Sequence, residues 1–479
     1  MTNIAKEIMK FMNTYVEKSR EIPVRGSYDV IVAGGGTAGF AAAIAAARRG
    51  SSVLVLERMN CLGGQMTAGI MGIFCAINDQ EKIVVKGIPE EFFDELHELG
   101  GVNDGLYGYD ETKRKCQFID YDAEAAKSLC NEYVLRERAK GHTLDILYET
   151  WISDCIVENN KVIGIIVENK TGRSAYYGKC IVDCTADADI VAWSGADFYQ
   201  LPVTELHPVT LITKLAGVDK QRVLDWYYNE HPTWVHNSPT QGWSEGIFHK
   251  FGIGPELEGY ELPPELEYLR SWFMLIYESP RDGEMYLNMT GEFHVDGTKT
   301  EEISDAITIS RKRIDDCVSV LKKVIPGYEN AYILATASLM GIRETRQVKG
   351  IYKLTEEDLF AFRRFDDALA TMSAPIGHHT ADGESAVFQN PSKGHAFDIP
   401  LRACVPEKMD GLIVAGRCIS ASHDAMGATR IMPGSMSIGQ GAGVAASLAV
   451  ELGVEPRDIP SDKLRAALLE QNVYLQPAE

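Results

Sequence analysis

The ten cysteines of this chain include no Cys-x-x-Cys pair, and the closest two, Cys180 and Cys184, lie in an apolar stretch. Iron–sulfur clusters and zinc knuckles need clustered thiolates, so neither is expected. The dithiol pair that disulfide reductases use is also missing. Scattered thiols of this kind are typical of buried, reduced cysteines, and we expect a cytoplasmic protein.

Basic residues are in the minority. The 479 residues include 47 Lys and Arg against 68 Asp and Glu, which gives a formal net charge of -21 and an isoelectric point near 5.0. Such a surface repels a phosphate backbone, so nucleic acid is not an expected partner. With 45% hydrophobic residues, the composition is otherwise that of an ordinary globular protein.

A long apolar run is missing from the amino-terminal segment. Residues 1–20 interleave apolar side chains with Lys and Glu, which predicts an amphipathic helix without the apolar core of a signal peptide. Residues 30–47 carry no charge and approach the length of a membrane span. Four glycines interrupt that stretch, at positions 34, 35, 36 and 39. We therefore expect no membrane association, and the glycines need another explanation.

These glycines lie inside a strand–helix–strand pattern. Residues 28–33 and 52–57 are apolar runs typical of buried strands, and the alanine-rich segment 41–49, closed by Gly50, predicts a helix between them. Apolar strands joined by a crossover helix indicate a parallel βαβ unit. A second strand and helix of this kind close the chain, at 411–416 and 433–452.

Further elements fill the space between these two regions. A helix is predicted over 122–140, and strands follow at 144–148, 161–168 and 179–183. A long helix is predicted over 301–324, because apolar residues repeat on one side, acids open the segment and lysines end it. We expect an α/β fold in which a Rossmann-like domain, with a parallel sheet and crossover helices, is built from two parts. These parts are residues 20–200 and 399–479, and an α+β substrate domain over 201–398 is inserted between them.

The segment Gly34-Gly35-Gly36-Thr37-Ala38-Gly39 has the form G-x-G-x-x-G, directly after the first strand and at the start of the helix. Gly34 permits the tight turn, Gly36 lets a pyrophosphate approach the backbone, and Gly39 allows close helix–strand packing. The helix N-terminus would then face the phosphates. Glu57 ends the second strand, where a carboxylate accepts bonds from ribose hydroxyls. The pattern predicts a dinucleotide site.

Three further segments, at 57–66, 179–189 and 410–416, decide which dinucleotide is expected. They carry a Glu-Arg pair leading to a Gly-Gly turn, a strand ending in Thr-Ala-Asp, and an Asp-Gly-Leu-x-x-Ala-Gly strand. In this order they resemble the signatures of flavoproteins of the glutathione-reductase superfamily, although Cys184 and Ala186 replace a small residue and a glycine. The resemblance implies an FAD-binding domain.

The resemblance also implies which residues surround the FAD. They are Gly34, Gly36, Thr37, Ala38, Gly39, Glu57, Arg58, Gly63, Gly64, Gln65, Met66, Ile156, Thr185, Asp187, Gly416, Arg417, Gly434, Ser435 and Met436.

More narrowly, the chain resembles the bacterial FAD-dependent oxidoreductases over nearly its whole length, notably at 341–355 and 398–402. Residues 427–436 also resemble a segment of fumarate reductase and succinate dehydrogenase flavoproteins. That second resemblance implies that Arg430 contacts the flavin or a substrate carboxylate, with the following helix N-terminus at the flavin pyrimidine. The His that carries covalent flavin in those enzymes has no equivalent here, so we expect non-covalent FAD.

Histidines are the candidate proton acceptors, because the pKa of imidazole lies near neutrality. His423 falls between the third flavin segment and Arg430, so it is either a base at the substrate or a structural histidine. His378 and His379 either line the pocket or lie on a surface loop. They have no third ligand at motif spacing, so no metal site is expected.

A cluster of charges contains Arg343 and Arg346 on either side of Glu344. One interpretation is an internal ion-pair network that joins two domains. The other is an anchor for a carboxylate, phosphate or sugar, because Arg offers bidentate donors. The residues alone do not decide between the two.

The sequence contains one glycine loop in a strand–helix context, so no second pyridine-nucleotide domain is expected. We predict an FAD-dependent oxidoreductase that moves a hydride between flavin N5 and a small polar substrate of the sugar, alcohol or hydroxy-acid type. An external electron acceptor or donor would complete the cycle, and a homo-oligomer is compatible with the sequence. The alternatives are a fumarate-reductase-like reductase or desaturase acting on a carbon–carbon double bond of a carboxylate, and an electron-transfer flavoprotein subunit of a complex.

Overall fold

The computed structural model describes residues 17–105, 108–236, 247–271, 274–288, 291–379, 386–389 and 391–476. The amphipathic helix expected over 1–20 falls almost wholly outside these residues. Within the described part of the chain, no helix is long and apolar enough to cross a membrane.

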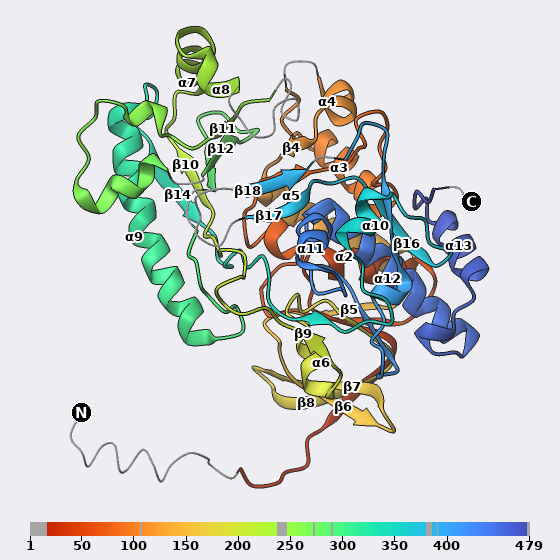
Figure 1. Ribbon diagram of the computed structural model, residues 1–479. Helices are drawn as coiled ribbons and strands as arrows, with labels where there is room; N and C mark the ends of the chain where they lie inside the picture. Colours follow the sequence, from red (N-terminus) through yellow and green to blue (C-terminus); the bar gives the residue numbers. More distant parts are fainter. Residues whose placement is uncertain are drawn as a thin grey trace, which may run out of the picture.

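A parallel sheet forms the centre of the larger unit (Figure 1). Its strand order is β5-β2-β1-β8, and β20 adds to the other side of β8. All of these pairings are parallel. The bounds are β1 Val24–Ala33, β2 Val53–Leu56, β5 Leu144–Leu147, β8 Gly172–Asp183 and β20 Leu412–Val414. The predicted α/β fold with a parallel sheet is therefore confirmed.

An antiparallel extension leaves one edge of this sheet. Strands β6 (Trp151–Glu158) and β7 (Lys161–Asn169) pair with each other, and β7 pairs with the first half of β8. The sequence predicted β7 and the end of β8 but not β6. The side chains of β6 are exposed or half-buried, so its sequence lacks the apolar run on which strand prediction relies.

Two helices made of small residues close the centre of the unit. The side chains of α2 (Thr37–Arg48) are almost all buried, and α12 (Met432–Leu452) packs across it. A Cβ atom on Gly439 would lie 2.1 Å from the backbone oxygen of Ala38, and one on Gly443 would lie 2.1 Å from that of Ala42. Only glycine permits this approach, so the C-terminal part of the chain docks directly on the first helix.

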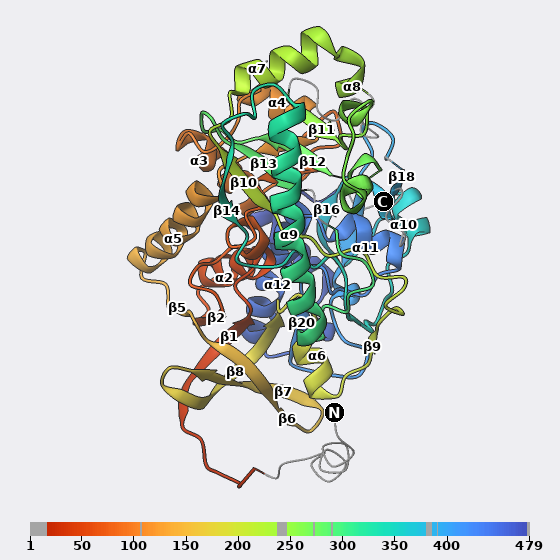
Figure 2. The same cartoon turned by 90° about the vertical axis from the view of Figure 1, so that its left-hand side faces the viewer.

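A second unit is built around an antiparallel sheet with strand order β11-β12-β13-β10-β14. The long helix α9 (Thr300–Val324) runs across one face of this sheet (Figure 2) and follows the predicted helix at 301–324 within one residue. The strand bounds are β10 Thr213–Ala216, β11 His249–Phe251, β12 Leu275–Glu278, β13 Met285–Asn288 and β14 Tyr332–Thr336.

The hydrophobic cores follow these two units. One core cluster gathers residues 209–340 with a few side chains of the segment 73–118. Another joins α2 and α12 to β16 (Ala368–Met372) and β19 (Phe397–Pro400), which pair with each other. The exact domain boundaries at 201 and 398 stay a prediction.

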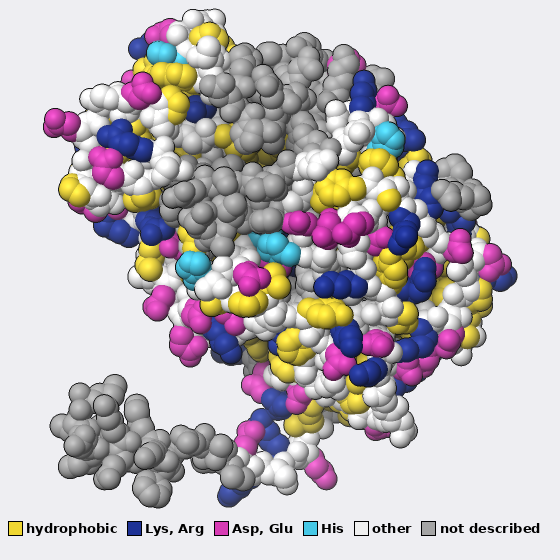
Figure 3. Space-filling model, in the orientation of Figure 1, with side chains coloured by type: hydrophobic (Ala, Val, Ile, Leu, Met, Phe, Trp, Pro, Cys, Tyr) yellow, Lys and Arg dark blue, Asp and Glu magenta, His cyan; other side chains and the backbone are white. Residues whose placement is uncertain are grey.

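The other elements are short or lie at the periphery. The helices are α3 Ile88–Glu98, α4 Tyr109–Lys115, α5 Ala123–Ala139, α6 Asp189–Ser194, α7 Lys220–Asp225, α8 Pro232–His236, α10 Glu356–Phe360, α11 His423–Thr429 and α13 Ser461–Glu470. The strands are β3 Ile73–Cys75, β4 Phe118–Asp120, β9 Phe198–Tyr199, β15 Gln347–Val348, β17 Ile376–His379 and β18 Ala386–Gln389. On the face drawn in Figure 3, acidic and basic side chains are interspersed over the described surface.

Candidate active site

The glycine loop after β1 is tied to the turn after β2. Gly63 N–H donates to the Gly35 oxygen over 2.8 Å, and the Thr37 hydroxyl donates to the Gly63 oxygen over 2.9 Å. Gly34 and Gly63 both have a positive φ, of +99° and +101°. The two turns predicted from separate motifs therefore form one surface at the N-terminus of α2.

The free space next to the backbone differs from one glycine of this loop to the next. A Cβ atom on Gly39 would lie 1.9 Å from the Gly34 oxygen, whereas one on Gly36 would meet no heavy atom within 4 Å. Gly36 is also the N-cap of α2 and has no side chain to accept from the first amides of the helix. Open space beside uncapped amides suits a pyrophosphate, so the loop fits the phosphates of FAD.

The candidate ribose acid lies beside the loop. The buried carboxylate of Glu57 accepts from the Gly35 and Met59 amides, each over 2.7 Å, and burial raises its pKa. The guanidinium of Arg58 lies 5.5 Å from the ring centre of Trp151, at the start of β6. Ile156 lies further along β6, opposite Gly164.

The turn after β8 joins both units. The Asp187 carboxylate accepts from the Thr345 hydroxyl over 2.7 Å and is ion-paired with Arg417. Arg346 donates from Nε to the Asp187 backbone oxygen over 2.9 Å and is ion-paired with Asp189. Arg346 thus takes part in an ion-pair network between segments, which is one of the two roles expected for it.

Other predicted cofactor residues lie close to the start of α2 or in the first turn of α12. A Cβ atom on Gly416 would lie 3.3 Å from that of Ala38. In α12, the Ser435 hydroxyl donates to the Arg430 backbone oxygen over 3.1 Å, and Met436 is fully buried. The Thr185 hydroxyl donates to Asp183 over 2.7 Å.

Three segments distant in sequence meet next to the Gly63-Gly64 turn. The Gln65 side-chain amide donates to the Met340 oxygen over 2.9 Å. Thr210 and Gly341 exchange two backbone hydrogen bonds, of 3.0 and 2.7 Å. Arg343 and Glu344 follow Gly341 by two and three residues, so these bonds hold their segment on the side of the cradle, the surface formed by the glycine loop and the Gly63-Gly64 turn.

Two guanidinium groups here, Arg343 and Arg430, are near enough for the charge of one to affect the other. Arg343 donates from Nη1 to the Pro208 oxygen over 2.5 Å. Burial, together with the charge of Arg430, lowers the pKa of Arg343 to about 9. Burial also lowers the pKa of Arg430 to about 10, and its buried Nε has no hydrogen-bond partner among the described residues. Both arginines are half-buried, and two cations that interact in such surroundings are suited to an anion.

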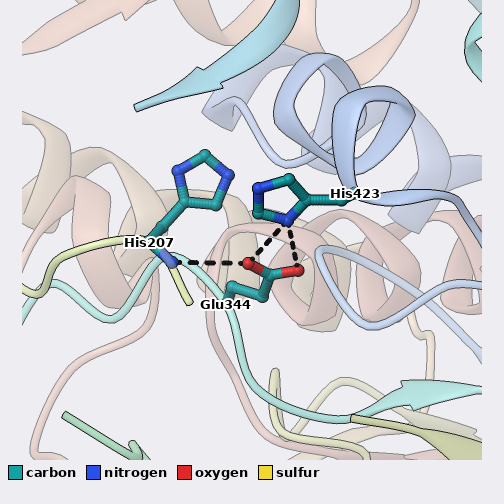
Figure 4. Close-up of side chains that lie close together, drawn as sticks. All are labelled: His207, Glu344 and His423. Carbon is teal, nitrogen blue, oxygen red and sulfur yellow. Dashed lines mark hydrogen bonds and ion pairs between the residues drawn. The ribbon is translucent and has the colours of Figure 1, made fainter. Parts of the chain in front are cut away.

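Two imidazoles and a carboxylate form a cluster (Figure 4), and the charge of its Glu344 reaches Arg430. His423 Nδ1 lies 3.0 Å from the Glu344 carboxylate, and the His207 backbone N–H donates to the same carboxylate over 3.4 Å. The ring centres of His207 and His423 are 4.7 Å apart. Burial is the largest single effect and lowers the pKa of His423, but the bond to Glu344 and the charges of Glu344 and Asp424 together raise it above its ordinary value.

The histidines predicted in the 378–379 pair belong to β17, which packs against α11. Their side chains lie outside the described residues. His207 is a residue that sequence reasoning missed, since it stands alone before Pro208 in a segment without a motif. The structure therefore brings His423, Arg343 and Arg430 together, adds His207 and Glu344, and places Arg346 in the network around Asp187.

Comparison with known proteins gives one family match and several partial or distant similarities. The family described as FAD dependent oxidoreductase matches residues 29–468. The thiamine thiazole synthase of Aeropyrum pernix is 33% identical over 140 residues, which are 29% of this chain and 43% of that protein. A geranylgeranyl bacteriochlorophyll reductase-like protein of Thermoplasma acidophilum is 14% identical, with a TM-score of 0.48 over 94% of this chain and 84% of that one. A variant of PqsL from P. aeruginosa is 12% identical, with a TM-score of 0.45 over 93% and 92%.

Proposed function

We propose that this chain, which belongs to the FAD-dependent oxidoreductase family, moves a hydride between flavin N5 and a small carboxylate-bearing substrate of the 2-hydroxy-acid type. The observation that carries the proposal is the buried Nε of Arg430, which has no hydrogen-bond partner among the described residues, together with the charge of Arg430 acting on Arg343. The charge of Glu344 reaches Arg430, but a sugar or simple alcohol would bring no counter-charge to Arg343. A carboxylate would supply one and could accept two parallel hydrogen bonds from either guanidinium.

The cofactor assignment is part of this proposal at the level of single residues. Gly36 and the first amides of α2 would hold the pyrophosphate, Glu57 the adenosine ribose, and the Gly63-Gly64 turn the flavin end. Bound flavin would supply the two-electron acceptor. A further acceptor outside this chain would return it to the oxidised form.

The residues of the chain would then act on the substrate in two ways. Arg343 and Arg430 bind the carboxylate and so orient the neighbouring C–H bond. His423 takes the proton of the adjacent hydroxyl at Nε2, because Nδ1 is bonded to Glu344 and the ring is fixed in direction. The substrate thus loses one hydride and one proton and becomes a 2-oxo acid.

A panel of compounds tests the proposal directly. The FAD-loaded protein is mixed anaerobically with 2-hydroxy acids, with the same alcohols lacking the carboxylate, and with sugars, and bleaching of the flavin absorbance is recorded. We expect bleaching by hydroxy acids alone. Equal bleaching by the alcohols or sugars would contradict the role of the arginines. Enoates added to the reduced protein test the fumarate-reductase-like alternative, which the same arginines favour.

Variants locate the carboxylate. Removal of one partner from a buried charge pair costs about 2–5 kcal/mol, so Arg343→Met and Arg430→Met should raise the concentration of hydroxy acid needed for half-maximal bleaching at least roughly thirtyfold. Arg346→Met is the matched control, because Arg346 is engaged with Asp187 and Asp189. It should lower stability and leave that concentration nearly unchanged.

A further inference from the structure

We infer that His207, Glu344 and His423 form a binding site for a divalent transition-metal ion at the wall of the substrate site. The inference of binding stands on these three side chains, and only the role of the ion rests on the proposed function. It departs from the sequence-based expectation of no metal site, because that expectation considered ligand spacing along the chain. In space the three residues meet from positions 137 and 79 residues apart.

The first argument is geometric. One ligand atom from each residue can be chosen so that all three lie within 4.8 Å of one another. Around a metal with ligand bonds of about 2.1 Å, tetrahedral ligand atoms are about 3.4 Å apart. The separations between ligand atoms therefore exceed the tetrahedral value by at most about 1.4 Å (4.8 minus 3.4), which is small compared with the reach of a rotating side chain. Figure 4 shows the two rings side by side above the carboxylate, so they approach the same space.

The ligand types narrow the choice of ion. Two imidazoles and one carboxylate suit zinc, iron(II) or cobalt(II) and leave coordination positions open, whereas magnesium and calcium prefer sites made of oxygen alone. The backbone that carries the ligands is also held in place. His207 and Glu344 are joined by a backbone-to-carboxylate bond, and the neighbouring Thr210 and Gly341 by two backbone bonds. Such support is what a metal site requires of its surroundings.

Burial favours a site built into the fold over a surface contact. His207 is 2% exposed and Glu344 is 4% exposed, and His423 is half-buried. The Glu344 carboxylate supplies the negative charge that a cation needs. With an ion bound, His423 acts as a ligand, and its role as proton acceptor belongs to the metal-free protein.

The neighbouring arginines give the site a distinctive property. The charge of Glu344 raises the pKa of Arg430, and the charge of Arg430 lowers the pKa of Arg343, so the three groups interact. A metal cation is repelled by both guanidiniums until an anion neutralises them. A 2-hydroxy acid could do so with its carboxylate and offer its hydroxyl oxygen to the ion. Metal and substrate should therefore strengthen each other's binding.

Direct metal binding tests the inference without any substrate. The FAD-loaded protein is stripped with EDTA, dialysed and titrated with Co²⁺, whose visible absorption reports imidazole ligation, and with Zn²⁺ by calorimetry. We expect one equivalent of either ion, lost in His207→Asn and Glu344→Gln. His142→Asn should retain it, because His142 forms a similar pair with Glu137 elsewhere, at 2.9 Å. Absence of stoichiometric binding to the parent protein, or its retention in both ligand variants, overturns the inference.

Two further measurements separate this inference from folding defects and from the proposed function. Flavin absorbance and thermal unfolding show whether each variant is folded. The second measurement is the affinity of Arg343→Gln for Co²⁺, which should be at least about fivefold higher than that of the parent because a repelling charge is lost. A weaker or unchanged affinity places the ion away from the arginines and overturns the site. Flavin bleaching by hydroxy acids in the EDTA-treated protein reports on the proposed function alone.

Discussion

The Gly36→Ala variant distinguishes an effect on cofactor binding from an effect on folding. In the structure the added Cβ meets no heavy atom within 4 Å, and the backbone angles of Gly36, φ -64° and ψ -169°, are allowed for alanine. Glycine is the better N-cap, so Gly36→Ala should lower the free energy of unfolding of the apoprotein by less than about 1 kcal/mol. If the pyrophosphate lies against this loop, however, the methyl occupies its space. FAD affinity should then fall at least about tenfold, or about 1.4 kcal/mol.

Gly39→Ala is the contrasting variant, because its Cβ would lie 1.9 Å from the Gly34 backbone oxygen. Backbone must move to relieve that contact, and we expect a loss of about 3 kcal/mol or more in stability. Flavin fluorescence quenching measures affinity, and chemical unfolding of the apoprotein measures stability. Parent-like FAD affinity in a folded Gly36→Ala variant would refute the assignment of the pyrophosphate to this loop.

Two predictions concern the turn after β8. Ala186 has a φ of +73°, where the resembling flavoproteins have glycine. The left-handed conformation costs an alanine about 1–2 kcal/mol, whereas a glycine stabilises the unfolded state by about 0.4–1 kcal/mol through its larger entropy. Ala186→Gly should therefore raise the free energy of unfolding of the apoprotein, measured in urea, by roughly 0.5–1 kcal/mol. An unchanged urea midpoint would contradict this prediction. Burial, with the charges of Asp187 and Asp183, raises the pKa of Asp189 to about 6. The ionised form of Asp189 therefore destabilises the folded parent protein as the pH rises. The free energy of unfolding of Asp189→Asn, relative to that of the parent, should grow by up to ~3 kcal/mol between about pH 4 and 7. A difference that stays constant or shrinks as the pH rises would refute the raised pKa.

The elements that the sequence predicted well carry their signals locally. The helix over 122–140 has its N-cap in Asp122, which accepts from the Glu124 amide over 3.0 Å, and α9 has its acids and lysines at the expected ends. Helix α2 begins at Thr37, four residues before the predicted start, because the glycine loop itself enters the helix. Strand β6 depends on pairing with β7, which no local pattern reports.

The residues of the candidate site also differ in whether a local sequence pattern could predict them. The glycine loop could be found because its residues are consecutive, and the geometry of a tight turn before a helix demands glycine there. The Glu344 carboxylate appeared in the sequence only as one member of a charge cluster. Its contacts with His207 and His423 arise from the packing of three segments around the Gly63-Gly64 turn, and a single sequence contains no signal for such a meeting.

Helix α12 connects the glycine loop with the segment that carries Arg430. Its glycines bring Gly439 against Ala38, in the first turn of the helix that faces the predicted pyrophosphate. Arg430 lies two residues before the start of α12, and the seven residue steps from Met432 to Gly439 span about 10 Å along the helix axis. In the proposed arrangement, the ribityl chain and ring of FAD would lie between the cradle and Arg430. The close contact of α12 with α2 therefore fixes the position of Arg430 relative to the glycine loop, and in the proposed arrangement it would fix the substrate relative to the cofactor.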